Sequence, residues 1–276
     1  MPTARVNGIT MYYEHHGAGE PLLLINGLGA DITLLAPIIA WFERSFRVVA
    51  FDNRGAGRTD KPDAPYTIEL IARNAAGLMD VLSLERANVL GISMRGRIAL
   101  EMALSCLGRV GGLVLVSTSA AGRGKVTLSW PMRLLLPLRW AGLLRGKYPQ
   151  PRYAHRRLRQ ASVSYDAADR IGDIRAPALI LHGRRDSTVP VDLAERMHAS
   201  VPGSQIELFQ RWPHLLPVRR APAVPRPGKP LPCQLTTQPA QTQPTEPHPT
   251  HGRSGSLPSF VLSVVSVRKL PTGHNG

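Results

Sequence analysis

The stretch Val89-Leu90-Gly91-Ile92-Ser93-Met94-Arg95-Gly96-Arg97 places one serine where two sequence patterns meet. An apolar, β-forming run at residues 87–90 precedes it, and a helix-forming run at residues 98–107 follows it. This layout is typical of a nucleophile elbow, a tight strand-to-helix turn that holds a serine hydroxyl above a parallel sheet. The sequence therefore indicates Ser93 as a candidate nucleophile.

The elbow pattern is incomplete. The turn crowds the neighbouring strand and helix, so the residues two places before and two places after the serine must be small. Gly91 meets the first requirement, but Arg95 stands in the second position and Gly96 follows one place late. We expect Arg95 to force the turn open or to bury a charge, unless its side chain escapes to solvent. A serine between two glycines also occurs by chance in loops, so the rest of the chain must decide the matter.

Strand and helix signals alternate along most of the chain. Asn7-Gly8 is a turn signal within residues 6–16, which predicts a hairpin of two short strands. Apolar runs predict strands at residues 21–26, 47–51, 87–90, 110–116 and 178–182, of a kind that suits burial on both faces of a parallel sheet, and residues 205–209 predict a last short strand. Helical spacing occurs at residues 34–42, 68–82, 98–107 and 191–199. The alternation predicts an α/β fold, a mostly parallel sheet flanked by helices, with its core at residues 1–118 and 172–216.

Residues 119–171 interrupt this alternation and form a predicted helical cap. Basic side chains alternate there with leucine and tryptophan, which predicts one apolar helix face. This face could pack over the end of the sheet or act as a lid that meets a substrate. A basic segment lying on a membrane is the weaker alternative, because Pro131 and Pro137 interrupt a long helix. As part of a lid, Trp130 and Trp140 are expected to contact substrate.

Composition limits the remaining possibilities. The 276 residues carry a net charge of +15, but the basic residues are not interleaved with aromatic residues or zinc-ligand spacing, so we expect no nucleic-acid partner. No run approaches the roughly 20 apolar residues that span a bilayer, so no stable membrane insertion is expected. Cys106 and Cys233 suggest no disulfide framework, and residues 1–8 lack a signal-peptide core. These features favour a cytoplasmic location.

Residues 217–276 are rich in Pro, Gln and Thr, which predicts a disordered tail.

Three groups with complementary chemistry follow predicted strands: Ser93, Asp186 and His214. Open α/β sheets place their ligand sites at such strand ends. Acyl transfer needs a nucleophile, a base that accepts its proton and an acid that orients the base. It also needs two donors for the oxyanion, for which the backbone N–H groups of Met94 and Leu28 are candidates. The sequence shows no metal-ligand cluster and no phosphate-binding loop.

Four stretches resemble the α/β-hydrolase superfamily in their order along residues 5–215. They are Leu22-Leu23-Leu24-Ile25-Asn26-Gly27-Leu28-Gly29-Ala30-Asp31, Phe51-Asp52-Asn53-Arg54-Gly55-Ala56-Gly57, the elbow, and Leu181-His182-Gly183-Arg184-Arg185-Asp186. The first of them, with Tyr66-Thr67-Ile68-Glu69 and Gly91-Ile92-Ser93-Met94, is similar to the branch that contains 3-oxoadipate enol-lactonases and related esterases.

The resemblance implies a role for each candidate residue. Ser93 would be the nucleophile, His214 the general base and Asp186 the residue that orients it, with Asp52 as the alternative acid. Asp186 could instead be a helix cap. Asn26 replaces the more common histidine of the oxyanion turn, and we expect it to line the substrate site.

The chain also departs from the family pattern at its end. Pro213 stands before His214 where the family usually has glycine, and the Pro-rich tail replaces the expected closing helix. A frameshifted or truncated family member would explain the tail.

These features lead to two hypotheses from different classes. The first is a cofactor-free serine hydrolase that cleaves small carboxylic esters or lactones, with perhydrolase- or haloperoxidase-like chemistry as a variant on the same triad. The apolar residues of the cap favour an apolar substrate, whereas its arginines could hold a carboxylate. The second hypothesis is a catalytically inactive member that only binds a ligand, for which Arg95 and the tail are the evidence. The sequence predicts no oligomeric state.

Overall fold

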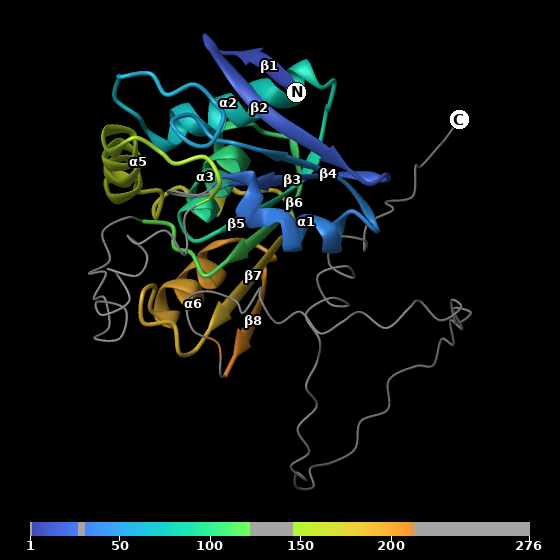
Figure 1. Ribbon diagram of the computed structural model, residues 1–276. Helices are drawn as coiled ribbons and strands as arrows, with labels where there is room; N and C mark the ends of the chain where they lie inside the picture. Colours follow the sequence, from blue (N-terminus) through green and yellow to red (C-terminus); the bar gives the residue numbers. More distant parts are fainter. Residues whose placement is uncertain (1, 27–30, 122–145, 211, 213–276) are drawn as a thin grey trace, which may run out of the picture. The chain divides into compact units, whose positions relative to one another are not determined.

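A computed structural model of the chain shows a twisted sheet with helices around it (Figure 1). The structure describes residues 2–26, 31–121, 146–210 and 212. The chain separates into two units, Met1–Arg219 and Arg220–Gly276, and every described residue lies in the first. The described strands are β1 (Thr3–Val6), β2 (Ile9–His16), β3 (Glu20–Ile25), β4 (Phe46–Phe51), β5 (Ala87–Ile92), β6 (Val110–Val116), β7 (Ala178–Gly183) and β8 (Gln205–Phe209).

These strands form an eight-stranded sheet in the order β1-β2-β4-β3-β5-β6-β7-β8. The first two strands form the predicted hairpin, and positive φ angles at Asn7 and Gly8 make its turn. Strand β2 pairs antiparallel with β4, and every later neighbour pair is parallel. The predicted α/β fold with a mostly parallel sheet is therefore confirmed.

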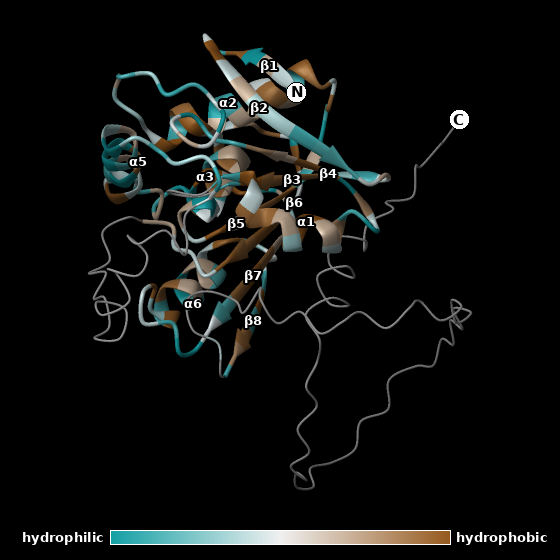
Figure 2. Ribbon diagram, viewed as in Figure 1, coloured by the Kyte–Doolittle hydropathy of each residue, from teal (hydrophilic) through white to brown (hydrophobic). Residues whose placement is uncertain are grey.

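The apolar runs form strands because both faces of the sheet are covered. Leu22, Leu23, Leu24 and Ile25 of β3 are buried, as is every residue of β5. In Figure 2 the central strands carry the hydrophobic colour. Burial on both faces explains why these strands lack polar alternation.

The helices agree with the sequence patterns, with two local differences. They are α1 (Ala36–Phe42), α2 (Ile68–Val81), α3 (Met94–Ser105), α5 (Arg152–Ser164) and α6 (Val191–Ser200). A 3-10 turn at Ile32–Leu35 precedes α1, and a proline in the first turn of α1 suits a helix start. Helix α3 begins directly after Ser93, four residues earlier than predicted. The hydroxyl of Thr67 accepts from Leu70 N at 3.1 Å and caps α2.

The described part of the predicted cap is tied firmly to the core. An isolated bridge pairs Ala121 with Asp166, near the two ends of the predicted cap. The Tyr153 hydroxyl donates to the Lys61 carbonyl oxygen at 2.6 Å. The cap boundaries at 119 and 171 and the tail boundary at 217 remain predictions, since residues 122–145 and 213–276 lie outside the described residues. In the part of the chain that the structure describes, no helix is long and apolar enough to cross a membrane.

Candidate active site

Ser93 occupies a sharp turn between β5 and α3. Its φ of 57° and ψ of −128° are strained for a residue with a side chain, at a cost of roughly 1–3 kcal/mol. Three hydrogen bonds hold the turn: Ser93 N donates to Val116 O at 2.8 Å, and Ser93 O accepts from Gly96 N at 2.9 Å and from the Thr118 hydroxyl at 2.7 Å. The strained backbone and its fixed position are what a nucleophile elbow requires.

Two glycines allow the close approach of strand and helix at this turn. A Cβ atom on Gly91 would lie 2.5 Å from the carbonyl oxygen of Arg95. A Cβ atom on Gly96 would lie 2.5 Å from the side chain of Thr118. The glycine three places after the serine therefore makes the contact with the loop after β6, and the turn forms with an arginine at the position before it.

Asp186 follows β7 and is 6% exposed. Its Oδ1 accepts from Thr188 N and Val189 N, both at 2.8 Å. The His182 ring is buried beside it, with Nε2 3.5 Å from Asp186 Oδ2 and 2.9 Å from Val189 O. Because a carbonyl oxygen only accepts, Nε2 carries the proton. Asp186 is not a helix cap, since α6 begins at Val191 with Pro190 before it.

Asp52, the alternative acid, is fully buried after β4. Its Oδ1 accepts from Ile32 N at 2.8 Å and from Asn26 Nδ2 at 3.3 Å, and its Oδ2 accepts from Arg58 N at 2.8 Å. Burial raises the pKa of this carboxyl group, against the opposing effect of the backbone donors of Arg58 and Ile32. Asp52 thus connects the chain on either side of residues 27–31 to the loop after β4. Asn26 is itself buried and contacts Asp52, so its predicted role in substrate binding remains a prediction.

The three side chains Ser93, Asp186 and Asp52 follow β5, β7 and β4, which are parallel. They therefore share the carboxyl edge of the sheet, where α/β proteins bind ligands. Two further residues, Leu28 and His214, lie outside the described residues, as do Trp130 and Trp140. Their predicted roles remain predictions.

Known hydrolases resemble this chain in sequence and in fold. The family model described as alpha/beta hydrolase fold matches residues 20–149. A putative carbamate hydrolase of Azorhizobium caulinodans is 27% identical, over 75% of this chain and 88% of the relative. A 2-hydroxy-6-oxononadienedioate/2-hydroxy-6-oxononatrienedioate hydrolase of Cupriavidus pinatubonensis is 29% identical, over 72% and 82%. The crystal structure of the enol-lactonase from Burkholderia xenovorans LB400 matches with a TM-score of 0.63 and 25% identity, over 75% of this chain and 91% of that one.

The chain belongs to the α/β-hydrolase superfamily. Its order of strands and its elbow after β5 are those of a hydrolase, and its named relatives are hydrolases. In this α/β-hydrolase, Met94 opens α3, so its amide is among the first-turn N–H groups that have no acceptor within the helix. Such a donor beside the candidate nucleophile Ser93 suits a developing oxyanion.

The departure of this α/β-hydrolase from the elbow pattern is Arg95. The residue is partly buried, and no hydrogen bond or ion pair joins its guanidinium to a described residue. Burial lowers its pKa to about 10. The lower pKa means that the fold disfavours the charged form, so at neutral pH the charge destabilises the native state.

We therefore expect Arg95→Met to stabilise the hydrolase by about 1–2 kcal/mol. A pKa shift of one unit corresponds to about 1.4 kcal/mol. The stabilisation expected here is smaller than the pKa shift of Arg95 alone would give, because the side chain keeps some contact with solvent. Thermal unfolding at pH 7 measures the change. Arg44→Met is the matched control, because Arg44 is exposed and its removal should alter stability by less than about 0.5 kcal/mol. If Arg95→Met were less stable than the wild type, favourable interactions of the guanidinium would outweigh the cost of burying its charge.

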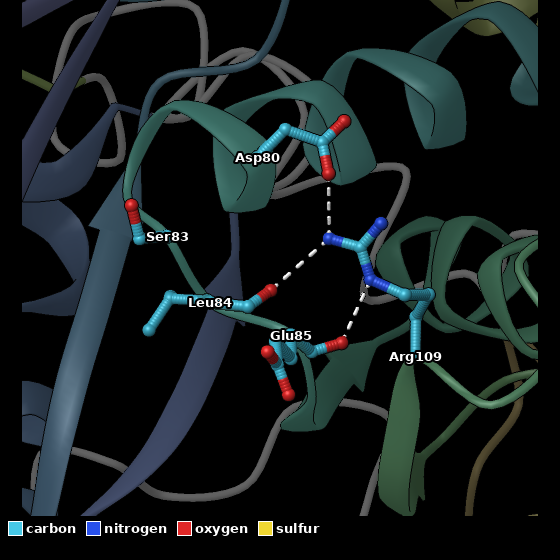
Figure 3. Close-up of a pocket in the computed structure, with 5 residues that line it drawn as sticks. All are labelled: Asp80, Ser83, Leu84, Glu85 and Arg109. Carbon is cyan, nitrogen blue, oxygen red and sulfur yellow. Dashed lines mark hydrogen bonds and ion pairs between the residues drawn. The ribbon is translucent and has the colours of Figure 1, made fainter.

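A surface depression at the opposite edge of the sheet is not part of the candidate site. Figure 3 shows its lining residues, Asp80, Ser83, Leu84, Glu85 and Arg109. Leu84 and Glu85 precede β5 and Arg109 precedes β6, so the depression lies at the amino edge. The Arg109 guanidinium donates to Asp80 at 2.7 Å, to Leu84 O at 3.0 Å and to Glu85 O at 2.8 Å. These bonds hold the turn between α2 and β5.

The sequence pattern does not indicate two residues that support the site. Thr118 holds the Ser93 carbonyl, and the buried His182 contacts Asp186. The pairing of β6 with β5 would have indicated Thr118, because it brings the loop after β6 beside the elbow. Among the described residues, no group of three or more His, Cys, Asp or Glu side chains could hold a metal ion.

Proposed function

We propose that this chain is a serine hydrolase that cleaves carboxylic esters or lactones through an acyl-enzyme. The observation that carries the proposal is Ser93 on a strained turn at the carboxyl edge of the sheet, directly before Met94, the first residue of α3. The enol-lactonase to which the chain is similar supports the choice of ester and lactone substrates. No cofactor takes part in the proposed reaction.

The proposed reaction uses the triad twice. His214 takes the proton of the Ser93 hydroxyl as Oγ bonds to the carbonyl carbon, and the amides of Met94 and Leu28 stabilise the oxyanion. Cleavage of the ester bond releases an alkoxide, which takes the proton from His214. A water molecule then gives its proton to His214 as its oxygen attacks the acyl carbon. The bond between the acyl carbon and Oγ breaks, His214 returns the proton to Oγ, and the acid leaves. Asp186 orients the histidine throughout.

Covalent labelling tests this proposal. A fluorophosphonate reporter phosphonylates a serine only when a base and an oxyanion site activate it, so we expect labelling of the intact chain and none of Ser93→Ala. The control is Ser45→Ala, which removes an exposed hydroxyl and should leave labelling unchanged. Circular dichroism verifies that each variant is folded.

The alternative function, an inactive binding protein, is favoured by one observation. Arg95 replaces a small residue in the elbow and carries a desolvated charge beside Ser93. Under this alternative, folded wild-type protein would not react with the fluorophosphonate, and Arg95→Gly would recover the reaction because it removes the arginine from the elbow.

A further inference from the structure

Most of the net charge of +15 comes from residues 119–164, which supply +10, and a further +6 comes from residues 217–276. Residues 119–164 contain ten Lys and Arg residues and no Asp or Glu. In contrast, residues 1–118 and 165–216 together contain 17 basic and 18 acidic residues, which nearly cancel. No acidic residue occurs between Glu101 and Asp166. Such segregation indicates a local function for the charge, because solubility alone requires only that the net charge differ from zero.

Helix α5 presents part of this charge as a single stripe. Ala154, Leu158 and Ala161 are buried on its inner side. Arg152, Arg156 and Arg159 are exposed and stand at spacings of four and three residues, which places them on one outer face. Val163 continues the same stripe and is 44% exposed. Figure 2 shows α5 coloured as a hydrophilic helix at the periphery of the described core.

Within the described part of the chain, the three outer arginines have no acidic partner to neutralise them. None of them makes an ion pair or hydrogen bond with a described residue, whereas the neighbouring Arg157 pairs with Asp63 and donates to Ala64 O. Exposed helices normally carry acid–base pairs at four-residue spacing, and like charges at that spacing are destabilising. Helix α5 has no acidic residue at all, so the stripe repels itself unless an external anion opposes it.

The helix is also mounted rigidly. Arg97 of α3 donates to Ser162 O at 2.9 Å and to the Ser162 hydroxyl at 2.6 Å. Tyr153 and Arg157 bind the chain at residues 61–64. A stripe held at both ends of its helix presents its charges at fixed positions, which lowers the entropy lost on binding.

We propose that the outer face of α5, defined by Arg152, Arg156, Arg159 and Val163, docks the protein on an anionic lipid surface. Basic helix faces with an apolar contact bind such surfaces through attraction to headgroups and shallow apolar burial. Single-stranded nucleic acid fits less well, because it needs exposed rings on which bases stack. The one aromatic residue of α5, Tyr153, is partly buried, with its hydroxyl bonded to the core.

Vesicle co-sedimentation tests the docking surface with the full chain. We expect binding to extruded vesicles of equimolar phosphatidylcholine and phosphatidylglycerol, and none to phosphatidylcholine alone. R152Q/R156Q/R159Q should weaken binding by about 100-fold, since each arginine near such a surface contributes roughly fivefold. The matching triple lysine variant should retain binding, because the interaction depends on charge.

A control removes the same charge elsewhere. R44Q/R73Q/R175Q replaces three exposed arginines outside α5 and should change vesicle binding by only a few-fold. Equal losses in the two glutamine variants would overturn the proposal, as would an absence of binding to anionic vesicles. Tighter binding of a single-stranded oligonucleotide that depends on the α5 arginines would assign the face to nucleic acid instead. Ester hydrolysis by each variant is measured in parallel. Vesicle binding tests the docking proposal and hydrolysis tests the proposed function, so failure of one can be told from failure of the other.

Discussion

His214→Ala is expected to lower kcat/KM for a small ester by about 10⁴-fold or more. A serine hydroxyl is a weak nucleophile at neutral pH, and without a base its proton stays on oxygen as the carbonyl is attacked. His214 follows β8, so its position along the chain places it after a strand of the same parallel set as β5 and β7. Turnover of a nitrophenyl ester measures the loss.

A matched histidine variant separates a lost base from a general disturbance. His198→Ala removes an imidazole from α6 that bonds to the Ser204 hydroxyl at 2.9 Å, and should keep activity within a few-fold. His182 is a poor alternative base, because its ring is buried and its protonated Nε2 bonds to Val189 O. If His214→Ala kept most of the activity, the base would have to be another residue.

The sequence predicted the strands well for a physical reason. A strand covered on both faces needs a continuous apolar run, and 22–25 and 87–90 are runs of this kind. The start of α3 was less predictable. Its first residues, Met94 to Arg97, carry a glycine and two arginines, so they lack an apolar periodicity, and only the positive φ of Ser93 in the folded chain lets the helix begin there.

The sequence predicted which residues belong to the candidate site, but it did not predict which residues they contact. Ser93 and Asp186 could be found from their order and from the strands before them. The support from Thr118 joins residues 25 positions apart, which local pattern does not encode. Arg95 shows the same limit: the pattern predicted crowding two places after the serine, whereas Gly96 makes the tight contact with Thr118 in the fold.

Asp186→Asn is expected to lower turnover by about 10⁴-fold with little change in KM, because the acid acts on the histidine in the transition state. The geometry determines how the amide will lie. Thr188 N and Val189 N both donate to the Oδ1 position, so the carbonyl oxygen of the new amide must remain there. The –NH₂ group then replaces Oδ2 and presents a donor where the histidine needs an acceptor.

Asp52→Asn distinguishes the two acids, because its effect should fall on stability rather than turnover. The amide loses the acceptor for Arg58 N and should destabilise the fold by about 1–3 kcal/mol. Burial already raises the pKa of Asp52, so a neutral side chain avoids the cost of a buried charge and offsets part of this loss. We expect its turnover to remain at least 100-fold above that of Asp186→Asn, a margin set by the roughly 10⁴-fold loss on removing a triad acid. Melting temperatures and turnover measured on both variants test the assignment, and the reverse order of turnover would make Asp52 the acid that orients His214.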